Sequence, residues 1–147
     1  MKGSVPDEPY WNPLVPEFTV AKLAASLAFY QAIGFGIRYQ RRVPDFAYIE
    51  LGQAQLMLEQ EHPTGWNVLP LDRPLGRGIN FQIQVPDLVC VTQALAGLGV
   101  PLFSAPQEAW YSTQDGEARG QRALLVQDPD GYLLRFAQCL GSRKSDA

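Results

Sequence analysis

The stretch VAKLAASLAFYQAIGF, residues 20–35, has a counterpart in VPDLVCVTQALAGLGV, residues 85–100. Five positions match at one constant offset of 65 residues, from 20 to 85: Val20, Leu23, Ile33, Gly34 and Phe35 pair with Val85, Leu88, Leu98, Gly99 and Val100. Apolar residues three and four positions apart give each stretch one hydrophobic helical face, and the glycine suits the helix C-terminus. Both stretches therefore predict a strand end followed by a helix, over residues 22–34 and 87–99.

Strand-like segments flank both predicted helices in the same order. They comprise residues 14–20, 36–42, 46–51 and 54–60 in the first half, and residues 79–85, 100–106, 121–127 and 132–138 in the second. The last segment follows Asp-Pro-Asp-Gly at 128–131, which is typical of a tight turn. Chance similarity of two amphipathic helices is the alternative explanation, but the glycines and the strand order repeat as well.

The repeat predicts the fold class. A unit with one helix cannot cover both faces of its own sheet, whereas two units can curl their sheets around a shared concave cleft with the helices outside. We expect an α+β fold of two tandem βαβββ modules, about 14–60 and 79–138, in a single domain of 147 residues. Residues 1–13 are expected to form an N-terminal arm, and residues 139–147 a polar tail.

Composition excludes several classes of protein. The chain is 46% hydrophobic and 18% charged, as in ordinary soluble globular domains, and no apolar run is long enough to span a membrane. Its net charge of −3 argues against nucleic-acid binding, which needs a basic patch. Two cysteines form no disulfide framework and the N-terminus lacks an apolar signal core, so we expect a cytoplasmic location.

Two motifs on this duplicated unit resemble a known superfamily. V-x-x-L-x-x-S-L-x-F-Y-x-x-x-G-F (20–35) and D-P-D-G-Y-x-L-R-F (128–136) are similar to motifs of the vicinal oxygen chelate superfamily. That superfamily contains glyoxalase I, extradiol dioxygenases, fosfomycin resistance enzymes and bleomycin resistance proteins. The resemblance covers about residues 14–138. Within the superfamily it is greatest to the bleomycin resistance proteins, in LMLE (56–59) and ALLVQDPDGYLLRFAQ (123–138).

The resemblance implies where a metal would be bound in the enzyme branches. His or Gln near the start of each module's first strand and Glu in its last strand hold a divalent ion there. The corresponding positions here are Val15 and Asn80, then Glu59 and Arg135. Val15 has no donor atom and Arg135 is a permanent cation, and a single carboxylate does not hold a catalytic ion. We therefore expect no metal, no other cofactor and no catalytic residue, and His62 is interpreted as a loop residue.

Glu59 and Arg135 occupy the last strand of each module, so we expect both side chains to point into the same cleft and to form an ion pair. Such a pair would neutralise two charges that are costly to bury separately. The alternative is that Arg135 lies at a strand edge or meets another acid such as Glu50.

Aromatic residues are the candidate ligand contacts, because flat rings suit a binder of heteroaromatic ligands. Trp66, Trp110 and Tyr111 lie in predicted loops. Phe46 and Tyr48 open a strand whose counterpart in the resistance family faces the drug. A loop tryptophan that merely covers a core edge is the alternative in each case. Together with the polar candidates, the predicted ligand-binding set is Phe46, Tyr48, Glu59, Trp66, Asn80, Trp110, Tyr111 and Arg135.

The resemblance implies a metal-independent small-molecule binding protein, similar to those that sequester antibiotics of the bleomycin type. Such a ligand is a bulky cationic glycopeptide, which an acidic protein suits. The superfamily also implies a symmetric homodimer, in which the arm around Pro13 and Pro16 could cross to the partner. Two alternatives stay open: a glyoxalase- or dioxygenase-type metalloenzyme with displaced ligands, and a binder of an unknown metabolite.

Overall fold

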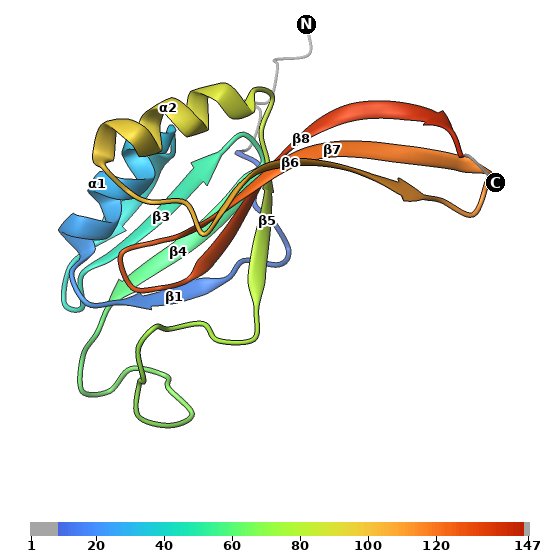
Figure 1. Ribbon diagram of the computed structural model, residues 1–147. Coiled ribbons are helices and arrows are strands. Elements are labelled where there is room, and N and C mark those ends of the chain that lie inside the picture. Colours follow the sequence, from blue (N-terminus) through green and yellow to red (C-terminus); the bar gives the residue numbers. More distant parts are fainter. Residues whose placement is uncertain (1–8, 146–147) are drawn as a thin grey trace, which may run out of the picture.

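The computed structural model describes residues 9–145; residues 1–8 and 146–147 lie outside the description (Figure 1). Eight strands and two helices follow one another along this part of the chain. They are β1 (Glu17–Val20), α1 (Leu23–Ile33), β2 (Gly36–Arg41), β3 (Phe46–Leu51), β4 (Ala54–Gln60), β5 (Asn80–Gln84), α2 (Leu88–Leu98), β6 (Ser104–Ser112), β7 (Glu117–Gln127) and β8 (Leu133–Lys144).

The two halves have the same sheet topology. The first sheet has the strand order β1-β4-β3-β2 and the second the order β5-β8-β7-β6. In each sheet the first strand pairs in parallel with the last, and the remaining pairs are antiparallel. The predicted α+β fold of two tandem βαβββ modules is confirmed. We call β1–β4 with α1 module 1, and β5–β8 with α2 module 2.

Both helices have a glutamine side chain that accepts a hydrogen bond at the N-terminus and a glycine that follows the C-terminus. Gln60, at the end of β4, accepts a hydrogen bond from the backbone N–H of Leu23 at 3.1 Å. Gln138 of β8 does the same for Leu88 at 2.9 Å. Each side chain satisfies one of the free N–H groups of a helix N-terminus. At the other end a glycine with positive φ, at position 34 or 99, ends the helix as the sequence predicts.

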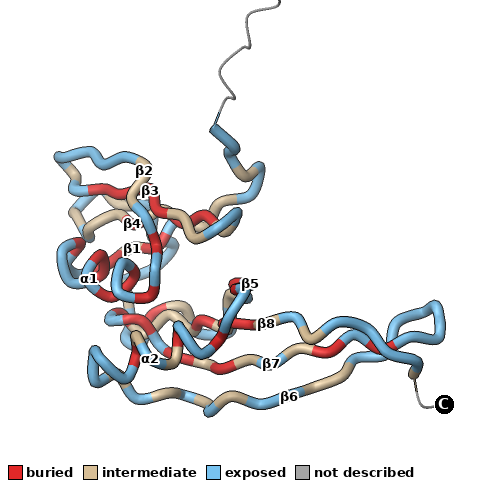
Figure 2. The backbone as a smooth tube through the Cα atoms, turned by 90° about the horizontal axis from the view of Figure 1, so that it is seen from above, coloured by how far each residue is buried: buried red, intermediate tan, exposed pale blue. Residues whose placement is uncertain are grey.

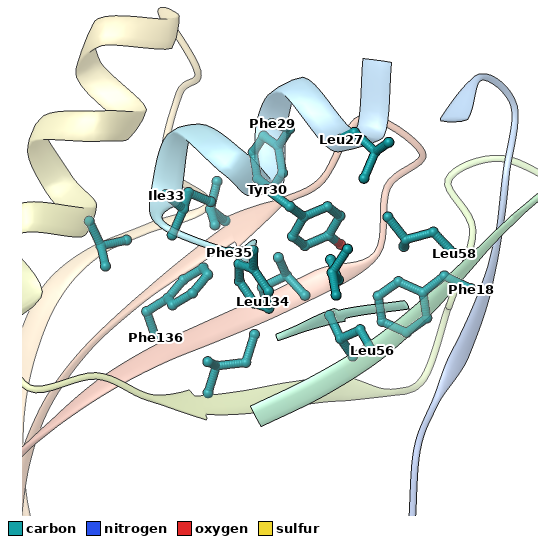
Figure 3. Packing of buried hydrophobic residues seen from close by; sticks show 14 of the residues in the cluster. Phe18, Leu27, Phe29, Tyr30, Ile33, Phe35, Leu56, Leu58, Leu134 and Phe136 are labelled. Carbon is teal, nitrogen blue, oxygen red and sulfur yellow. The ribbon is translucent and has the colours of Figure 1, made fainter. Parts of the chain in front are cut away.

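A single hydrophobic core joins the modules through the helix-side faces of their sheets. The ring of Phe18 in β1 stacks on Tyr132 at 4.2 Å and packs against Phe81 of β5 at 4.8 Å. Figure 3 shows Leu134 and Phe136 of β8 among the side chains of module 1. The modules are therefore held together on the side of the helices.

The Asp-Pro-Asp-Gly turn between β7 and β8 is anchored in module 1. Asp130 accepts hydrogen bonds from the backbone N–H of Ala21 at 2.9 Å and from the guanidinium of Arg73 at 2.8 Å. Asp128 accepts one from the hydroxyl of Tyr30 at 2.7 Å. Both carboxylates are buried. The motif therefore links the two modules, in addition to turning the chain.

The C-terminal half departs from the sequence-based expectation. β6 begins at Ser104, later than predicted, and runs through Trp110 and Tyr111, which were expected in a loop. β8 continues to Lys144, so residues 139–144 of the predicted polar tail belong to a strand. These residues lack a continuous apolar face, but β7 pairs with both strands over their outer halves. Backbone pairing thus forms strands where side-chain pattern gives a weak signal.

The outer halves of β6, β7 and β8 form a three-stranded projection. In Figure 1 they extend together away from the helices, and Figure 2 shows from a second direction that this part is largely exposed. We call residues 107–112, 117–122 and 138–144 the β-arm. It carries the only long strand edges that leave the body of the molecule within residues 9–145.

Candidate functional site

Each sheet has one face turned away from the helices, which we call the helix-free face. Strand residues alternate between the two faces, so core residues identify the other set. In β4, Leu56 and Leu58 lie in the core, and Met57 and Glu59 lie on the helix-free face. In β8, Leu134 and Phe136 lie in the core. The same alternation places Arg135 on the helix-free face of the second sheet.

An aromatic cluster covers the helix-free face of the first sheet. Tyr48 packs against Trp11 at 5.0 Å and stacks on Tyr39 at 5.4 Å, and the guanidinium of Arg41 lies 4.2 Å from the ring centre of Phe46. Phe46 and Tyr48 are only 1% and 4% exposed. The structure places both predicted residues on the expected face, beneath other side chains of the same chain.

The N-terminal arm holds this cover in place. The side-chain carbonyl of Gln55 accepts a hydrogen bond from the backbone N–H of Asn12 at 2.8 Å, and its amide donates to the carbonyl of Tyr10 at 2.8 Å. Arg38 stacks on the ring of Trp11 at 4.3 Å and pairs with Glu50 at 2.6 Å. Residues 9–13 of the predicted arm therefore pack on their own module. A ligand reaches Tyr48 only if these contacts open.

Beside the aromatic cluster lies a hollow of about 340 Å³, which contains Glu17, Glu59, His62 and Trp66. Burial raises the pKa of Glu17, and the nearby carboxylate of Glu59 raises it further. Nε2 of His62 lies 3.4 Å from a carboxylate oxygen of Glu59. The guanidinium of Arg41 also lines the hollow and acts to lower the pKa of Glu17, so the two carboxylates share the hollow with a cation. Trp66, which is 94% exposed, lines the same hollow.

The strand register separates Glu59 from Arg135. In module 1, Thr19 of β1 pairs with Glu59. The residue 65 positions later, Gln84 of β5, pairs with Ala137. The structural equivalent of Glu59 is therefore Ala137, which lies two residues, or about 7 Å, beyond Arg135 along β8.

The expectation that Glu59 and Arg135 form an ion pair is wrong within residues 9–145. The carboxylate of Glu59 lies against His62, and no carboxylate lies within 4.0 Å of the Arg135 guanidinium. The hollows that contain the two side chains share no residue. The alternative pairing of Arg135 with Glu50 is also excluded, since Glu50 pairs with Arg38.

The helix-free face of the second sheet carries two adjoining hollows, of about 170 and 260 Å³. The smaller contains Arg135 and the larger contains Arg119 and Cys139, and Tyr111 and Gln121 line both. The thiol of Cys139 accepts a hydrogen bond from the backbone N–H of Gly141 and another from the guanidinium of Arg119. These two donors lower the pKa of Cys139.

Adjacent aromatic residues of β6 point to opposite faces. Tyr111 is 54% exposed and lines both hollows of the second sheet. Trp110 packs on Gly120 of β7, and the guanidinium of Arg143 lies 4.1 Å from its ring centre. Neither hollow contains Trp110. Asn80 is an exposed residue at the start of β5, outside both hollows.

The site residues do not fit the divalent metal that the fold suggests. The register makes Met57 the equivalent of Arg135, because Glu17 pairs with Met57 as Gln82 pairs with Arg135. Neither a thioether nor a guanidinium replaces a carboxylate as ligand of a hard divalent ion. Within residues 9–145 no three His, Cys, Asp or Glu side chains are grouped so that they could hold a metal ion.

Sequence reasoning missed several residues of the helix-free faces. Trp11 belongs to a segment without periodicity, and its place becomes known only from its contacts with Tyr48 and Arg38 in the structure. Glu17 could have been found, since alternation in EFTV puts it opposite the apolar Phe18 and Val20. Arg119 could not have been found, because the strand predicted in this region begins only at residue 121.

Comparisons with known proteins bear on the fold. A scan against models of protein families finds no match, and a search among curated proteins finds none either. Solved structures do match. A glyoxalase/bleomycin resistance protein/dioxygenase from Alicyclobacillus acidocaldarius has a TM-score of 0.58 at 16% identity, covering 88% of this chain and 92% of that chain.

Two further solved structures match over similar lengths. A bleomycin-binding protein complexed with bleomycin has a TM-score of 0.55 at 24% identity, covering 87% of this chain and 98% of that chain. A conserved domain protein has a TM-score of 0.59 at 26% identity, covering 88% of this chain and 99% of that chain. These likenesses show the fold. In addition, neither helix of the described chain is long and apolar enough to cross a membrane.

Proposed function

The chain has the vicinal oxygen chelate fold, and from this premise we propose that it is a metal-independent small-molecule binding protein, similar in action to proteins that sequester bleomycin-type antibiotics. In such a protein no bond is made or broken. The ligand is held on the helix-free faces of the two sheets, so that it is kept from its target.

The observation that carries this proposal is the chemistry of the register-matched positions. Arg135 of β8 and Met57 of β4 occupy equivalent positions in the last strands of the two modules. In the first strands, Asn80 is the polar residue at the position that corresponds to a metal ligand of the superfamily. A cation, a thioether and an exposed amide bind organic groups, but they do not hold a catalytic Zn²⁺, Fe²⁺ or Mn²⁺. The helix-free faces nonetheless keep aromatic and charged side chains available for a ligand.

The first sheet offers contacts for a cationic, partly aromatic ligand. Glu17 and Glu59 line one hollow with Arg41, so its two carboxylates outnumber its one guanidinium, and the exposed ring of Trp66 lines it as well. A ligand ammonium group placed there would be paired with carboxylates and could lie over an aromatic face. A cationic glycopeptide of the bleomycin type has both kinds of group, and the bleomycin complex of a protein with this fold motivates its use as the first probe.

We propose further that the protein is a symmetric homodimer in the cytoplasm. The hollows of the two helix-free faces are shallow and separate within one chain. A second copy placed against them would convert open faces into a closed cleft with walls from both subunits. Both cysteines are free, which suits a reducing compartment.

A calorimetric titration tests the proposed function. We expect metal-free or copper-loaded bleomycin to bind stoichiometrically to protein that was purified in the presence of a chelator. Glu59→Gln should weaken binding by about tenfold, the usual loss when a charged hydrogen bond is removed. Glu61→Gln, a change of the same kind at an exposed loop residue, is the matched control and should bind as the wild type does.

Two results would speak against this function. Absence of binding by both forms of bleomycin at millimolar concentration would exclude sequestration of this drug. Stoichiometric retention of Zn, Ni, Mn or Fe(II) after desalting, abolished by Glu59→Ala, would favour the metalloenzyme with displaced ligands instead.

A further inference from the structure

We propose that the helix-free face of the second sheet binds an organic oxyanion, a carboxylate or phosphate group, and that Arg135 is the cation that holds it. The inference rests on the proposed function in one respect, that ligands bind on the helix-free faces. It specifies the chemistry of the ligand group that goes to the second sheet.

The state of Arg135 is the first reason. Its side chain is half-buried, and its Nε is shielded from solvent without any hydrogen-bond acceptor in the described residues. No carboxylate of residues 9–145 lies within ion-pair distance of its guanidinium. A shielded charged donor without a partner costs free energy, so an acceptor supplied from outside the chain would be favourable.

Other arginines of the chain have a partner for the guanidinium group. Arg38 pairs with Glu50 at 2.6 Å, and Arg73 with Asp130 at 2.8 Å. Arg143 stacks on an aromatic ring at 4.1 Å. Each of these three arginines thus has a carboxylate or an aromatic ring as its partner, whereas within residues 9–145 Arg135 has neither.

The surroundings of Arg135 are the second reason. Its hollow of about 170 Å³ contains the side chains of Gln107, Tyr111 and Gln121, and neither Asp nor Glu. Amide NH₂ groups and a phenol hydroxyl can donate hydrogen bonds to an anionic oxygen. A planar guanidinium binds a carboxylate or phosphate with two parallel hydrogen bonds. All these donors suit an anion, and no lining group would neutralise a cation.

The adjoining hollow extends the site. Tyr111 and Gln121 also line this second space, of about 260 Å³, which again contains no carboxylate and ends at Arg119. Arg119 lies six positions along β7 from Leu125, the strand partner of Arg135, which corresponds to about 20 Å. A ligand whose anionic group meets Arg135 therefore has room for a planar part against the exposed ring of Tyr111.

Proton–nitrogen NMR of the arginine Nε–Hε groups tests this directly, with phenyl phosphate and benzoate as probes at constant ionic strength. The Arg135 signal is identified by its loss in Arg135→Gln. Benzylamine, which has a similar ring and the opposite charge, is the control ligand. Arg122→Gln is the matched control variant, because Arg122 belongs to β7, is exposed and lines neither hollow.

We expect a saturable shift of the Arg135 Nε–Hε signal with both anions and none with benzylamine. Arg135→Gln should weaken binding of phenyl phosphate by about tenfold or more, as expected for loss of a charge-assisted hydrogen bond. Arg135→Lys keeps the charge but not the planar fork, so its affinity should lie between those of wild type and Arg135→Gln. Arg122→Gln should match wild type within about twofold.

Equal affinity of wild type and Arg135→Gln for the anions would overturn the inference, as would preferential binding of benzylamine at this face. It would also be overturned if the Arg135 signal were insensitive to the anions and changed only with protein concentration, because a second copy would then supply the acceptor. Binding of bleomycin without binding of anions removes this inference and leaves the proposed function. The reverse result removes the proposed drug sequestration and leaves the anion site.

Discussion

Asp128 lies in the turn between β7 and β8 and is only 5% exposed. It accepts hydrogen bonds from Tyr30 and from the backbone N–H groups of Asp130 and Tyr132, which favour its ionised form. Burial outweighs them and raises the pKa of Asp128 from 3.8 to about 6. A single carboxyl group thus couples the junction of the two modules to pH.

This pKa shift predicts a pH dependence of stability. Because the folded state binds the proton more tightly than the unfolded state, the contribution is present below about pH 4 and is lost as the pH rises to about 6. A shift of about two units corresponds to about 3 kcal/mol of unfolding free energy. Urea unfolding of wild type and of Asp128→Asn at pH 4 to 7 measures this dependence. The unfolding free energy of wild type, relative to that of the variant, should fall by an amount of this order over the pH range. A constant difference would contradict it.

Arg135 and Glu59 give a second prediction at the scale of residues. Since neither is the partner of the other, a double-mutant cycle with Glu59→Gln and Arg135→Leu should be additive within about 0.5 kcal/mol. Arg135→Leu alone should leave the unfolding free energy unchanged or raise it, because a shielded donor without an acceptor is removed. Urea denaturation measures both. A coupling energy above about 1 kcal/mol would mean that the two charges meet in solution.

At the scale of elements, the 65-residue repeat predicted both helices and the inner strands, because apolar periodicity and terminal glycines are local signals. It did not predict the β-arm. Residues 107–112 and 139–144 form strands through backbone pairing with β7, for which side-chain pattern is a weak indicator.

The candidate site was predictable in part. The resemblance to the resistance family placed Phe46 and Tyr48 on the ligand side of their strand, and both lie on the helix-free face, but the resemblance could not show that Trp11 and Tyr39 cover Tyr48. The pairing of Glu59 with Arg135 failed because the two were taken as equivalent positions, whereas the strand register makes Met57, two residues before Glu59, the equivalent of Arg135. A shift of two keeps both side chains on the same kind of face, so sequence alternation alone cannot detect it.

The β-arm depends on Gly120. A Cβ at this position would lie 2.7 Å from atoms of the Trp110 ring, which Arg143 covers on its other side. We therefore expect Gly120→Ala to expel the ring and to destabilise the protein by about 1–3 kcal/mol, the usual range for overpacking. Faster amide hydrogen exchange should be confined to the outer halves of β6, β7 and β8.

Gly97→Ala is the matched control for this change. Gly97 lies in α2, has no neighbour within 4 Å of an added Cβ and does not have positive φ. Alanine is the better helix former, so the variant should be more stable by a few tenths of a kcal/mol, up to about 1. Equal effects of the two substitutions would show that the contact between Trp110 and Gly120 does not hold the β-arm.

At the scale of the whole molecule, the two modules share one core on their helix sides. Within residues 9–145 no helix or second sheet packs on either helix-free face, and only the short segment 9–13 covers part of the first one. A β-arm with long strand edges projects beyond this body (Figure 2). We expect a symmetric dimer at micromolar concentration by light scattering, with part of these surfaces covered. A monomer that binds ligand at the same concentration would exclude a cleft shared between subunits.

Binding of the ligand with and without metal tests the central proposal most directly. Protein stripped with EDTA is titrated calorimetrically with metal-free bleomycin, and again after incubation with Zn, Ni, Mn or Fe(II) salts and desalting. We expect the same dissociation constant in all cases and far less than one metal equivalent retained per chain, because Met57 and Arg135 offer no carboxylate. Binding or turnover that appears only after metal is restored would contradict the proposal that this is a metal-independent binding protein.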